Sequence, residues 1–261
     1  MLISDLSRGT VTQRVSDLTK LAGFTRTRRF RRKLEASRMV VEEWLQTCER
    51  PAVACGGGKD STALMLLCRS LNPTIPIYRA DPPNPLPDRP EYVEQLRMAA
   101  GGEWRVVPYP WDVDAVLEGD EDYPVMLKVR LLEQQMAADG IDGIALGIRA
   151  AESKSRTVAL RTRGLLYWAK KRQAWTCAPL AWWTAEEVVG YILARDAVPL
   201  NPVYHKLTAA PPLDYLRDGT WYPREVSDAD GYREWLAMHY ADCIPSYDQA
   251  LEIQIVRGLQ S

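Results

Sequence analysis

Residues 51–62 read Pro-Ala-Val-Ala-Cys-Gly-Gly-Gly-Lys-Asp-Ser-Thr and decide the fold of this chain. The first five residues form a short apolar run of strand character, and the segment from Ser61 to Ser70 has leucines at helical spacing. Three glycines therefore lie at a strand-to-helix junction, where they let a ligand approach the backbone. A helix N-terminus favours anions, and Lys59 adds a positive charge. The stretch predicts a phosphate-binding loop.

Two known types of phosphate loop are candidates for this stretch. A Walker A loop needs a glycine five residues before Gly58 and a hydroxyl residue after Lys59, but Val53 and Asp60 occupy those positions. The stretch instead resembles the S-G-G-x-D-S pyrophosphate loop of the N-type ATP pyrophosphatases, with Gly56 where that family usually has serine. The alternative is a glycine-rich turn between a strand and a helix that binds no ligand.

Composition excludes several classes of protein. A chain of 261 residues with 46% hydrophobic residues and a net charge of −1 is long enough for one large α/β domain with a small appendage. We expect a soluble, cytoplasmic protein, because no segment approaches 18 consecutive apolar residues or resembles a cleaved leader. No C-x-x-C pair occurs, so we expect neither disulfides, a zinc knuckle nor an iron–sulfur cluster from the scattered cysteines Cys48, Cys55, Cys68, Cys177 and Cys243.

Strands and helices alternate after the glycine loop. Further strands are predicted at 75–78, 104–108 and 141–147, and helices at 91–100 and 125–139. This alternation predicts an α/β fold with a doubly wound, mostly parallel, five-stranded, Rossmann-like sheet and a loop-rich C-terminal helical extension. Ligands of such sheets bind beyond the carboxyl ends of the strands, which is where the glycine loop lies.

Three regions are predicted along the chain. Residues 1–50 form an N-terminal helical extension, residues 51–204 the nucleotide-binding α/β domain, and residues 205–261 a C-terminal extension packed on the core. The α/β domain ends with a helix over 184–195 that begins at a capping box, with Thr184 as N-cap and Glu187 three residues later. The extension contains predicted helices at 230–240 and 246–259.

A second group of charged residues follows the strand at 141–147. Residues 147–156 read Gly-Ile-Arg-Ala-Ala-Glu-Ser-Lys-Ser-Arg, which separates Arg149 and Arg156 by about two helical turns. Two guanidinium groups at that spacing can flank one anion, and Glu152 can hold either arginine in place. The alternative is a solvated, charged start of a helix.

The order of these motifs resembles the phosphoadenosine phosphosulfate reductase superfamily. The glycine loop, the G-I-R-x-x-E-S-x-x-R segment, Ala-Pro-Leu-Ala-Trp-Trp-Thr at 178–184 and Leu-Asn-Pro-Val-Tyr at 200–204 occur in the family's order. That superfamily includes sulfonucleotide reductases, the small subunit of sulfate adenylyltransferase and the sulfur-transfer component of DNA phosphorothioation systems. The resemblance covers about residues 53–204 and does not specify one reaction.

The resemblance implies roles for particular residues. Lys59, Asp60, Arg149 and Arg156 are the candidate catalytic residues, with the two arginines facing the anionic substrate or pyrophosphate. Asp81 lies where members of this fold meet the adenosine, and Asp60 is the expected protein contact of Mg²⁺. The candidate nucleotide-binding residues are Cys55, Gly56, Gly57, Gly58, Lys59, Asp60, Ser61, Thr62, Asp81, Gly147, Arg149 and Glu152.

The first functional hypothesis is an enzyme that binds ATP and Mg²⁺, cleaves the bond between the α- and β-phosphates and transfers AMP to an unidentified acceptor. Such an enzyme would act in a sulfur-transfer or nucleic-acid-modification pathway such as DNA phosphorothioation. The second is a sulfonucleotide reductase with Cys243 as nucleophile, although the Ala-Asp-Cys-Ile-Pro sequence at 241–245 differs from the Glu-Cys-Gly-Leu-His segment of the reductases. The third is a non-catalytic, nucleotide-sensing subunit with partner subunits in a nucleic-acid-modifying complex.

Other residues have two interpretations each. The basic run from Arg26 to Lys33 is either a solvated start of a helix or a surface that contacts nucleic-acid phosphates, and basic residues between 161 and 172 would extend that surface. Cys55 is either a strand-core residue or a sulfur relay. The pairs Trp182-Trp183 and Trp221-Tyr222 are either core or a stacking wall for a base.

Overall fold

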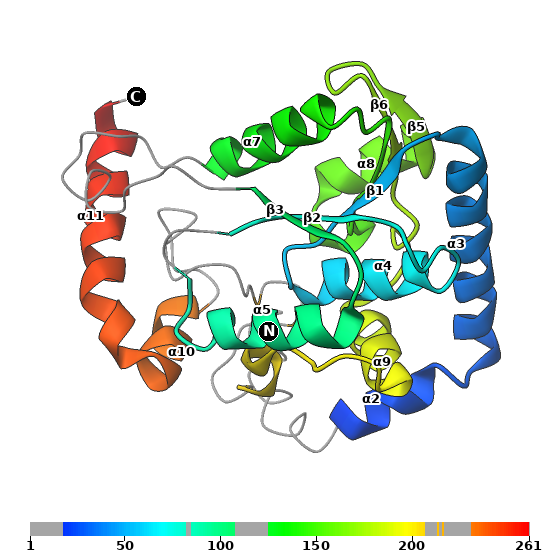
Figure 1. Cartoon of the computed structure of the whole chain (residues 1–261). Helices are drawn as coiled ribbons and strands as arrows, with labels where there is room; N and C mark the ends of the chain where they lie inside the picture. Colours follow the sequence, from blue (N-terminus) through cyan, green and yellow to red (C-terminus); the bar gives the residue numbers. More distant parts are fainter. Residues whose placement is uncertain are drawn as a thin grey trace.

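The computed structural model describes residues 18–81, 85–107, 125–206, 213, 216 and 231–260. These residues form a six-stranded sheet with helices on both faces (Figure 1). The strands are β1 (Pro51–Ala54), β2 (Ile77–Ala80), β3 (Trp104–Val107), β4 (Gly143–Ala145), β5 (Leu166–Ala169) and β6 (Ala174–Cys177). The helices are α2 (Leu18–Phe24), α3 (Arg28–Thr47), α4 (Lys59–Arg69), α5 (Arg89–Ala100), α7 (Val125–Ala138), η1 (Ala150–Glu152), α8 (Lys154–Arg163), α9 (Ala185–Arg195), η2 (Pro202–His205), α10 (Tyr232–His239), η3 (Ala241–Cys243) and α11 (Ile244–Gln260).

The strand order is β3-β2-β1-β4-β6-β5, and all neighbouring strands are parallel except the antiparallel pair of β5 and β6. The predicted doubly wound, mostly parallel sheet is therefore confirmed, with six strands instead of five. The sequence patterns locate β1 to β4, and the two strands that they do not locate, β5 and β6, form a hairpin. Its turn has no Asn-Gly or Asp-Gly signal, because Gln173 supplies the left-handed conformation with a φ of 51°.

Side chains alternate across the sheet and make two apolar layers. Val53 and Ile77 face the larger cluster that includes Leu64 of α4, whereas Tyr78 faces a second cluster that includes Met136 of α7. Figure 1 shows α7 on one face of the sheet and α4, α5 and α9 on the other. Strands β1 and β2 thus contribute buried side chains to both layers, as expected for a parallel sheet between two layers of helices.

The strand order places a switch point beside β1. The chain leaves β1 to build β2 and β3 on one side, and then returns to build β4 on the other. The loops that follow β1 and β4 therefore diverge from adjacent strand ends and leave room for a ligand between them. Both predicted constellations, the glycine loop and the segment from Gly147, lie at this point.

The flanking helices contact the same core. Helix α2 lies against α9 so closely that a Cβ on Gly190 would be 2.3 Å from the carbonyl oxygen of Leu21. The predicted capping box of α9 is present, since the Thr184 hydroxyl accepts from the Glu187 N–H and the Glu187 carboxylate accepts from the Thr184 N–H. Trp235 of α10 belongs to the large apolar cluster. Within the described residues, no helix is long and apolar enough to cross a membrane.

Candidate functional site

The glycine loop joins β1 to α4 in a conformation that requires glycine. Gly57 has a φ of +90°, which side-chain-bearing residues rarely adopt, and Gly58 precedes the first turn of α4 without a side-chain cap. The hydroxyl of Tyr204, in η2, accepts a hydrogen bond of 3.0 Å from the Lys59 N–H. Asn201 Nδ2 donates to the Gly57 carbonyl at 3.4 Å. The segment around η2 thus contacts the loop directly.

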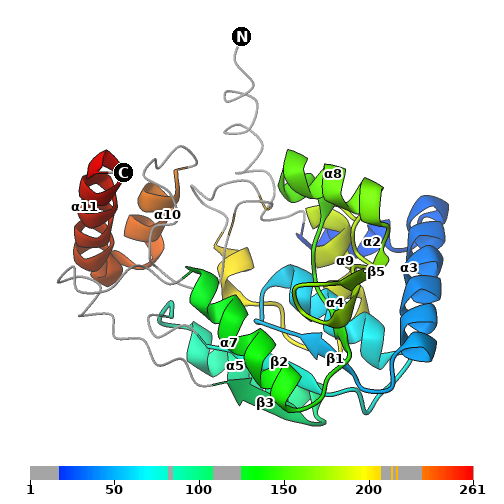
Figure 2. The ribbon, with the colours of Figure 1, turned by 90° about the horizontal axis from the view of Figure 1, so that it is seen from above.

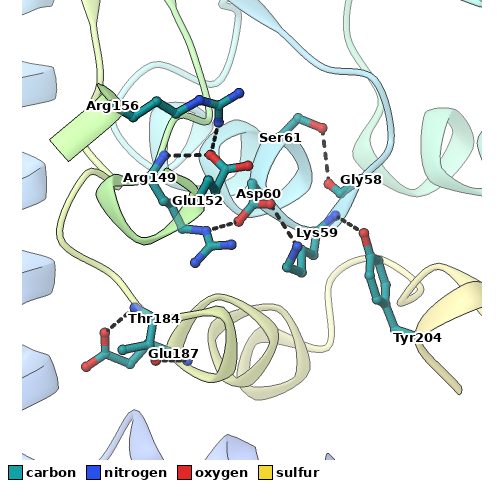
Figure 3. Close-up of polar contacts among 10 residues, drawn as sticks. All are labelled: Gly58, Lys59, Asp60, Ser61, Arg149, Glu152, Arg156, Thr184, Glu187 and Tyr204. Atoms are coloured by element: carbon teal, nitrogen blue, oxygen red, sulfur yellow. Dashed lines mark hydrogen bonds and ion pairs between the residues drawn. The ribbon is translucent and has the colours of Figure 1, made fainter. Parts of the chain in front are cut away.

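Two buried cations meet one carboxylate at the start of α4 (Figure 3). The Lys59 side chain is 2% exposed, and its Nζ lies 3.0 Å from Asp60 Oδ2. The Arg149 side chain is fully buried, and its Nε lies 2.5 Å from Asp60 Oδ1. The group carries a surplus positive charge at a helix N-terminus, where the backbone dipole also favours an anion. A buried surplus charge of this kind is compatible with binding of a phosphate group.

Glu152 holds the segment that carries the two predicted arginines. Its Oε2 accepts from the Arg149 backbone N–H at 3.0 Å and forms an ion pair with Nη1 of Arg156. The Arg156 side chain is 42% exposed. In the view of Figure 3 the two guanidinium groups lie on opposite sides of the Glu152 carboxylate. That both arginines clamp one anion stays a prediction. Both contact Glu152, and of the two only Arg149 also contacts Asp60.

Gly147 brings the loop after β4 against the start of α4. A Cβ at this position would lie 2.9 Å from the carbonyl carbon of Asp60 and 3.0 Å from the Ser61 nitrogen. Real Cβ atoms do not approach backbone atoms that closely, and the backbone on either side belongs to the candidate site. Gly147 therefore acts as a spacer that lets Arg149 reach Asp60.

We expect Gly147→Ala to lower both the melting temperature and the affinity for ATP, because the methyl group forces the start of α4 away from the loop after β4. The cost expected for overpacking is about 1–3 kcal/mol. The matched control is Gly23→Ala, since nothing lies within 4 Å of a Cβ at Gly23. Calorimetric titration with ATP and thermal melting of both variants check this. Wild-type affinity in Gly147→Ala would show that the close approach does not shape the site.

Two buried arginines support the loop from the side of β2. Arg79 and Arg89 are 2% and 3% exposed, and both donate to the carbonyl oxygen of Gly56, at 3.1 Å and 2.7 Å. Both also form ion pairs with Asp81. Sequence reasoning named Asp81 but missed both arginines, because they converge on Gly56 only after β2 and α5 pack beside β1. A contact of Asp81 with adenosine stays a prediction.

The remaining loop side chains differ in their surroundings. Cys55 is 1% exposed, and its Sγ lies 3.9 Å from the Ser61 hydroxyl, which donates to the Gly58 carbonyl at 3.1 Å. Thr62 is also buried, and its hydroxyl lies 3.5 Å from that of Tyr92 in α5. Cys55 thus fits the strand-core interpretation better than the sulfur relay. The side chain of Thr62 supports the packing of α4 on α5.

Asp60, the expected protein contact of Mg²⁺, is ion-paired with two cationic side chains. Both carboxylate oxygens of Asp60 are ion-paired, one with Lys59 and one with Arg149. Among the residues that the structure describes, no three His, Cys, Asp or Glu side chains gather as a metal site. Direct coordination of Mg²⁺ by Asp60 stays a prediction, and it would require one of these ion pairs to open.

The two tryptophans before α9 differ in burial. Trp183 is 2% exposed, its ring packs edge-on against Phe30 at 4.8 Å, and its Nε1 donates to Ser37. The stacking-wall interpretation is therefore wrong for Trp183, because the aromatic packing between α3 and α9 buries it. Trp182 remains 42% exposed. The pair Trp221-Tyr222 lies outside the described residues.

The chain belongs to the phosphoadenosine phosphosulfate reductase domain family, whose model matches residues 50–209. The structure is similar to phosphoadenylyl-sulfate reductase from Candida auris in its phosphate complex, with a TM-score of 0.52 and 16% identity over 65% of this chain and 83% of that chain. At that identity the likeness shows a shared fold.

Two other solved structures are also similar. FMN adenylyltransferase from Candida glabrata in complex with FMN and AMPCPP gives a TM-score of 0.48 and 11% identity over 70% of this chain and 64% of that chain. NH3-dependent NAD synthetase from Campylobacter jejuni gives 0.44 and 12% over 87% and 96%. No curated protein sequence matches this chain significantly.

Proposed function

We propose that this protein binds ATP at the loop before α4, cleaves the bond between the α- and β-phosphates, transfers AMP to an acceptor oxygen and releases pyrophosphate. The observation that carries the proposal is the meeting of Lys59 and Arg149, both buried, on the Asp60 carboxylate at the start of α4. Membership of the family adds support for an adenine nucleotide as the ligand.

The residues present fit a chain of phosphates. The left-handed conformation of Gly57 turns the backbone around the loop, and Gly147 leaves no space for a side chain beside the start of α4. Lys59 and Arg149 supply charge-assisted donors, and phosphate oxygens prefer such donors. Tyr204 fixes the first turn of α4 through the Lys59 N–H. The loop is thus held in one conformation before a ligand arrives.

The proposed reaction needs positioning and charge stabilisation. The acceptor oxygen forms a bond to the α-phosphorus, while the bond from that phosphorus to the α–β bridging oxygen breaks and its electron pair leaves with pyrophosphate. Lys59 and the N-terminus of α4 would stabilise the charge that develops on pyrophosphate. Arg149, held by Asp60, would orient the α-phosphate, and the more exposed Arg156 would meet the acceptor.

The cysteines favour adenylation over reduction. A reductase needs an accessible thiol whose thiolate forms readily. Four of the five cysteines are buried, and only Cys243 is partly exposed. Burial, together with the nearby Asp242, raises the pKa of the Cys243 thiol above its ordinary value. A raised pKa lowers the thiolate fraction at neutral pH, so Cys243 is poorly suited to attack sulfur.

We therefore expect Cys243→Ser to retain ATP binding and cleavage to AMP in the presence of the true acceptor. The measurement is turnover of the variant beside wild type, with thermal melting as the check on folding. Loss of activity in the folded variant, together with a thiosulfonate trapped on Cys243 of wild type in mass spectrometry, would instead identify a reductase.

Product analysis tests the proposed function against its rivals. Incubation with ATP labelled at the α-phosphate and candidate acceptors is run beside incubation with phosphoadenylyl sulfate and reduced thioredoxin. The proposal requires labelled AMP or an AMP adduct together with pyrophosphate. Sulfite from the second incubation would favour the reductase, and tight ATP binding without any product would favour a nucleotide-sensing subunit.

A further inference from the structure

Basic residues are concentrated in two segments of this chain. Residues 26–38 and 154–173 together contain fourteen of the 33 Lys and Arg residues but only one of the 34 Asp and Glu residues. Because the whole chain has a net charge of −1, these segments carry +13 and the rest of the chain carries −14. Folding does not require such a separation, and it creates a positive field on one part of a nearly neutral protein.

Most of these cations face solvent. Among the described residues, only Lys33, Arg156 and Arg172 of the fourteen have a carboxylate within ion-pair distance. The exposed members are Arg26, Arg28, Arg29, Arg31, Arg32, Lys154, Arg161, Arg163, Lys170 and Lys171. We call the exposed cations of the two segments the basic surface. Their charges are not neutralised within the part of the chain that the structure describes.

The two segments are connected through residues 178 and 179, which follow β6. Ser37 of α3 donates to the Pro179 carbonyl at 2.6 Å, and the neighbouring Ala178 N–H donates at 2.8 Å to the carbonyl of Leu165, just after α8. Figure 2 shows the end of α8 next to α3. Helix α8 begins at the site, where Arg156 is paired with Glu152. The basic surface therefore extends from the candidate nucleotide site along α8 towards α3, and Lys170 and Lys171 continue it at the turn between β5 and β6, at the end of the sheet opposite the glycine loop.

Aromatic side chains accompany the cations on the edge strand. Strand β5 forms the edge of the sheet, and Trp168 on it is 43% exposed while its ring packs edge-on against Trp175 at 5.8 Å. The Arg163 guanidinium lies over the Tyr167 ring, 5.7 Å from its centroid. Cations combined with accessible aromatic rings are typical of surfaces that contact phosphates and stack bases.

We propose that the basic surface binds nucleic acid, so that a nucleic-acid strand is the partner that reaches the candidate nucleotide site. The assignment of the strand as an AMP acceptor or its carrier rests on the proposed function, whereas the binding itself does not. A free nucleotide would contact only the loop before α4 and the segment that follows β4. A cationic surface that runs over two helices and a sheet edge instead matches a long chain of phosphates.

The test is fluorescence anisotropy of labelled single-stranded and duplex oligonucleotides, titrated with the full chain between about 50 and 200 mM salt. The test variant combines Arg161→Gln, Arg163→Gln, Lys170→Gln and Lys171→Gln, none of which lies in the nucleotide site. Its control removes the same charge elsewhere, through substitution by Gln of the exposed cations Arg97, Arg105, Arg130 and Arg195.

Wild type and the control should bind with a steep salt dependence. The test variant should bind at least about tenfold more weakly at the lowest salt, with a salt slope flatter by about 0.9 for each duplex phosphate that it no longer neutralises. Absence of binding by wild type, equal weakening in both variants, or preference for anionic lipid vesicles over oligonucleotides would overturn the proposal. Aggregation of the test variant with unchanged binding would also overturn it, since the cations would then only protect the sheet edge.

Calorimetric titration with ATP separates this proposal from the proposed function. The test variant should bind ATP as wild type does, because its substitutions lie outside the loop and its contacts. If wild type binds oligonucleotides but neither binds nor cleaves ATP, the proposed function fails and the basic surface stands. If ATP is bound and cleaved but oligonucleotides are not bound, only the proposal that the basic surface binds nucleic acid is contradicted.

Discussion

Lys59→Ala is expected to weaken ATP binding by about 10- to 150-fold, because it deletes a charge-assisted contact to phosphate worth about 1.5–3 kcal/mol. The Lys59 side chain is 2% exposed and held by Asp60, so little conformational entropy is lost when its ammonium meets an anion. The measurement is isothermal calorimetric titration of wild type and variant with ATP.

The control for Lys59→Ala is Arg97→Ala, which also removes an ion-paired cation but at an exposed position on α5. It should bind ATP with wild-type affinity. Thermal melting has to show that Lys59→Ala remains folded. Unchanged affinity in the folded Lys59 variant would remove the glycine loop from consideration as the phosphate site.

The second large effect concerns stability. Arg149→Ala is expected to lower the free energy of unfolding by about 3 kcal/mol, because it removes the charged partner of Asp60 Oδ1, which Lys59 does not contact, and empties space in the core. Arg156→Ala should change it by no more than about 1 kcal/mol, because the Arg156 side chain is 42% exposed. The sequence alone does not distinguish the two arginines, but in the structure Arg149 is buried and Arg156 is partly exposed.

Urea denaturation of both variants measures these free energies, and turnover measurements accompany it. Both variants should lose activity, since both lie at the site, and Arg149→Lys should restore part of the stability but little of the turnover because lysine lacks the planar fork. Equal stability of Arg149→Ala and Arg156→Ala would contradict the buried contact of Arg149 with Asp60.

Local sequence patterns predicted the elements that present the site. The capping box at Thr184 and Glu187 depends on residues three positions apart, and the structure contains it. The start of α4 after three glycines depends on backbone freedom at one junction, and Gly57 does adopt a positive φ. The alternation of strands and helices gave the layers of the fold. In each case the determining interactions join residues that are close in the sequence.

Contacts between distant segments were not predictable in the same way. Tyr204 reaches the Lys59 N–H across 145 residues, and Arg79 reaches Gly56 across 23. The Leu-Asn-Pro-Val-Tyr motif at 200–204 marks Tyr204 as part of the family pattern but not its contact with the loop, and Arg79 has no flanking pattern that distinguishes it from an ordinary residue. Trp183 is buried because Phe30 and Ser37 of α3 and Tyr191 of α9 contact it. Such roles follow from tertiary packing, which one sequence does not specify.

Cleavage of two ATP analogues tests the central claim most directly. In AMPPNP the α–β bridge is an ordinary oxygen and the β–γ bridge is an imide, whereas in AMPCPP the α–β bridge is a methylene group. With the acceptor present, an enzyme that cuts between the α- and β-phosphates should convert AMPPNP to an AMP product and imidodiphosphate and leave AMPCPP intact. Formation of ADP and phosphate from ATP, with AMPPNP left intact, would contradict the assignment of α–β cleavage to this site.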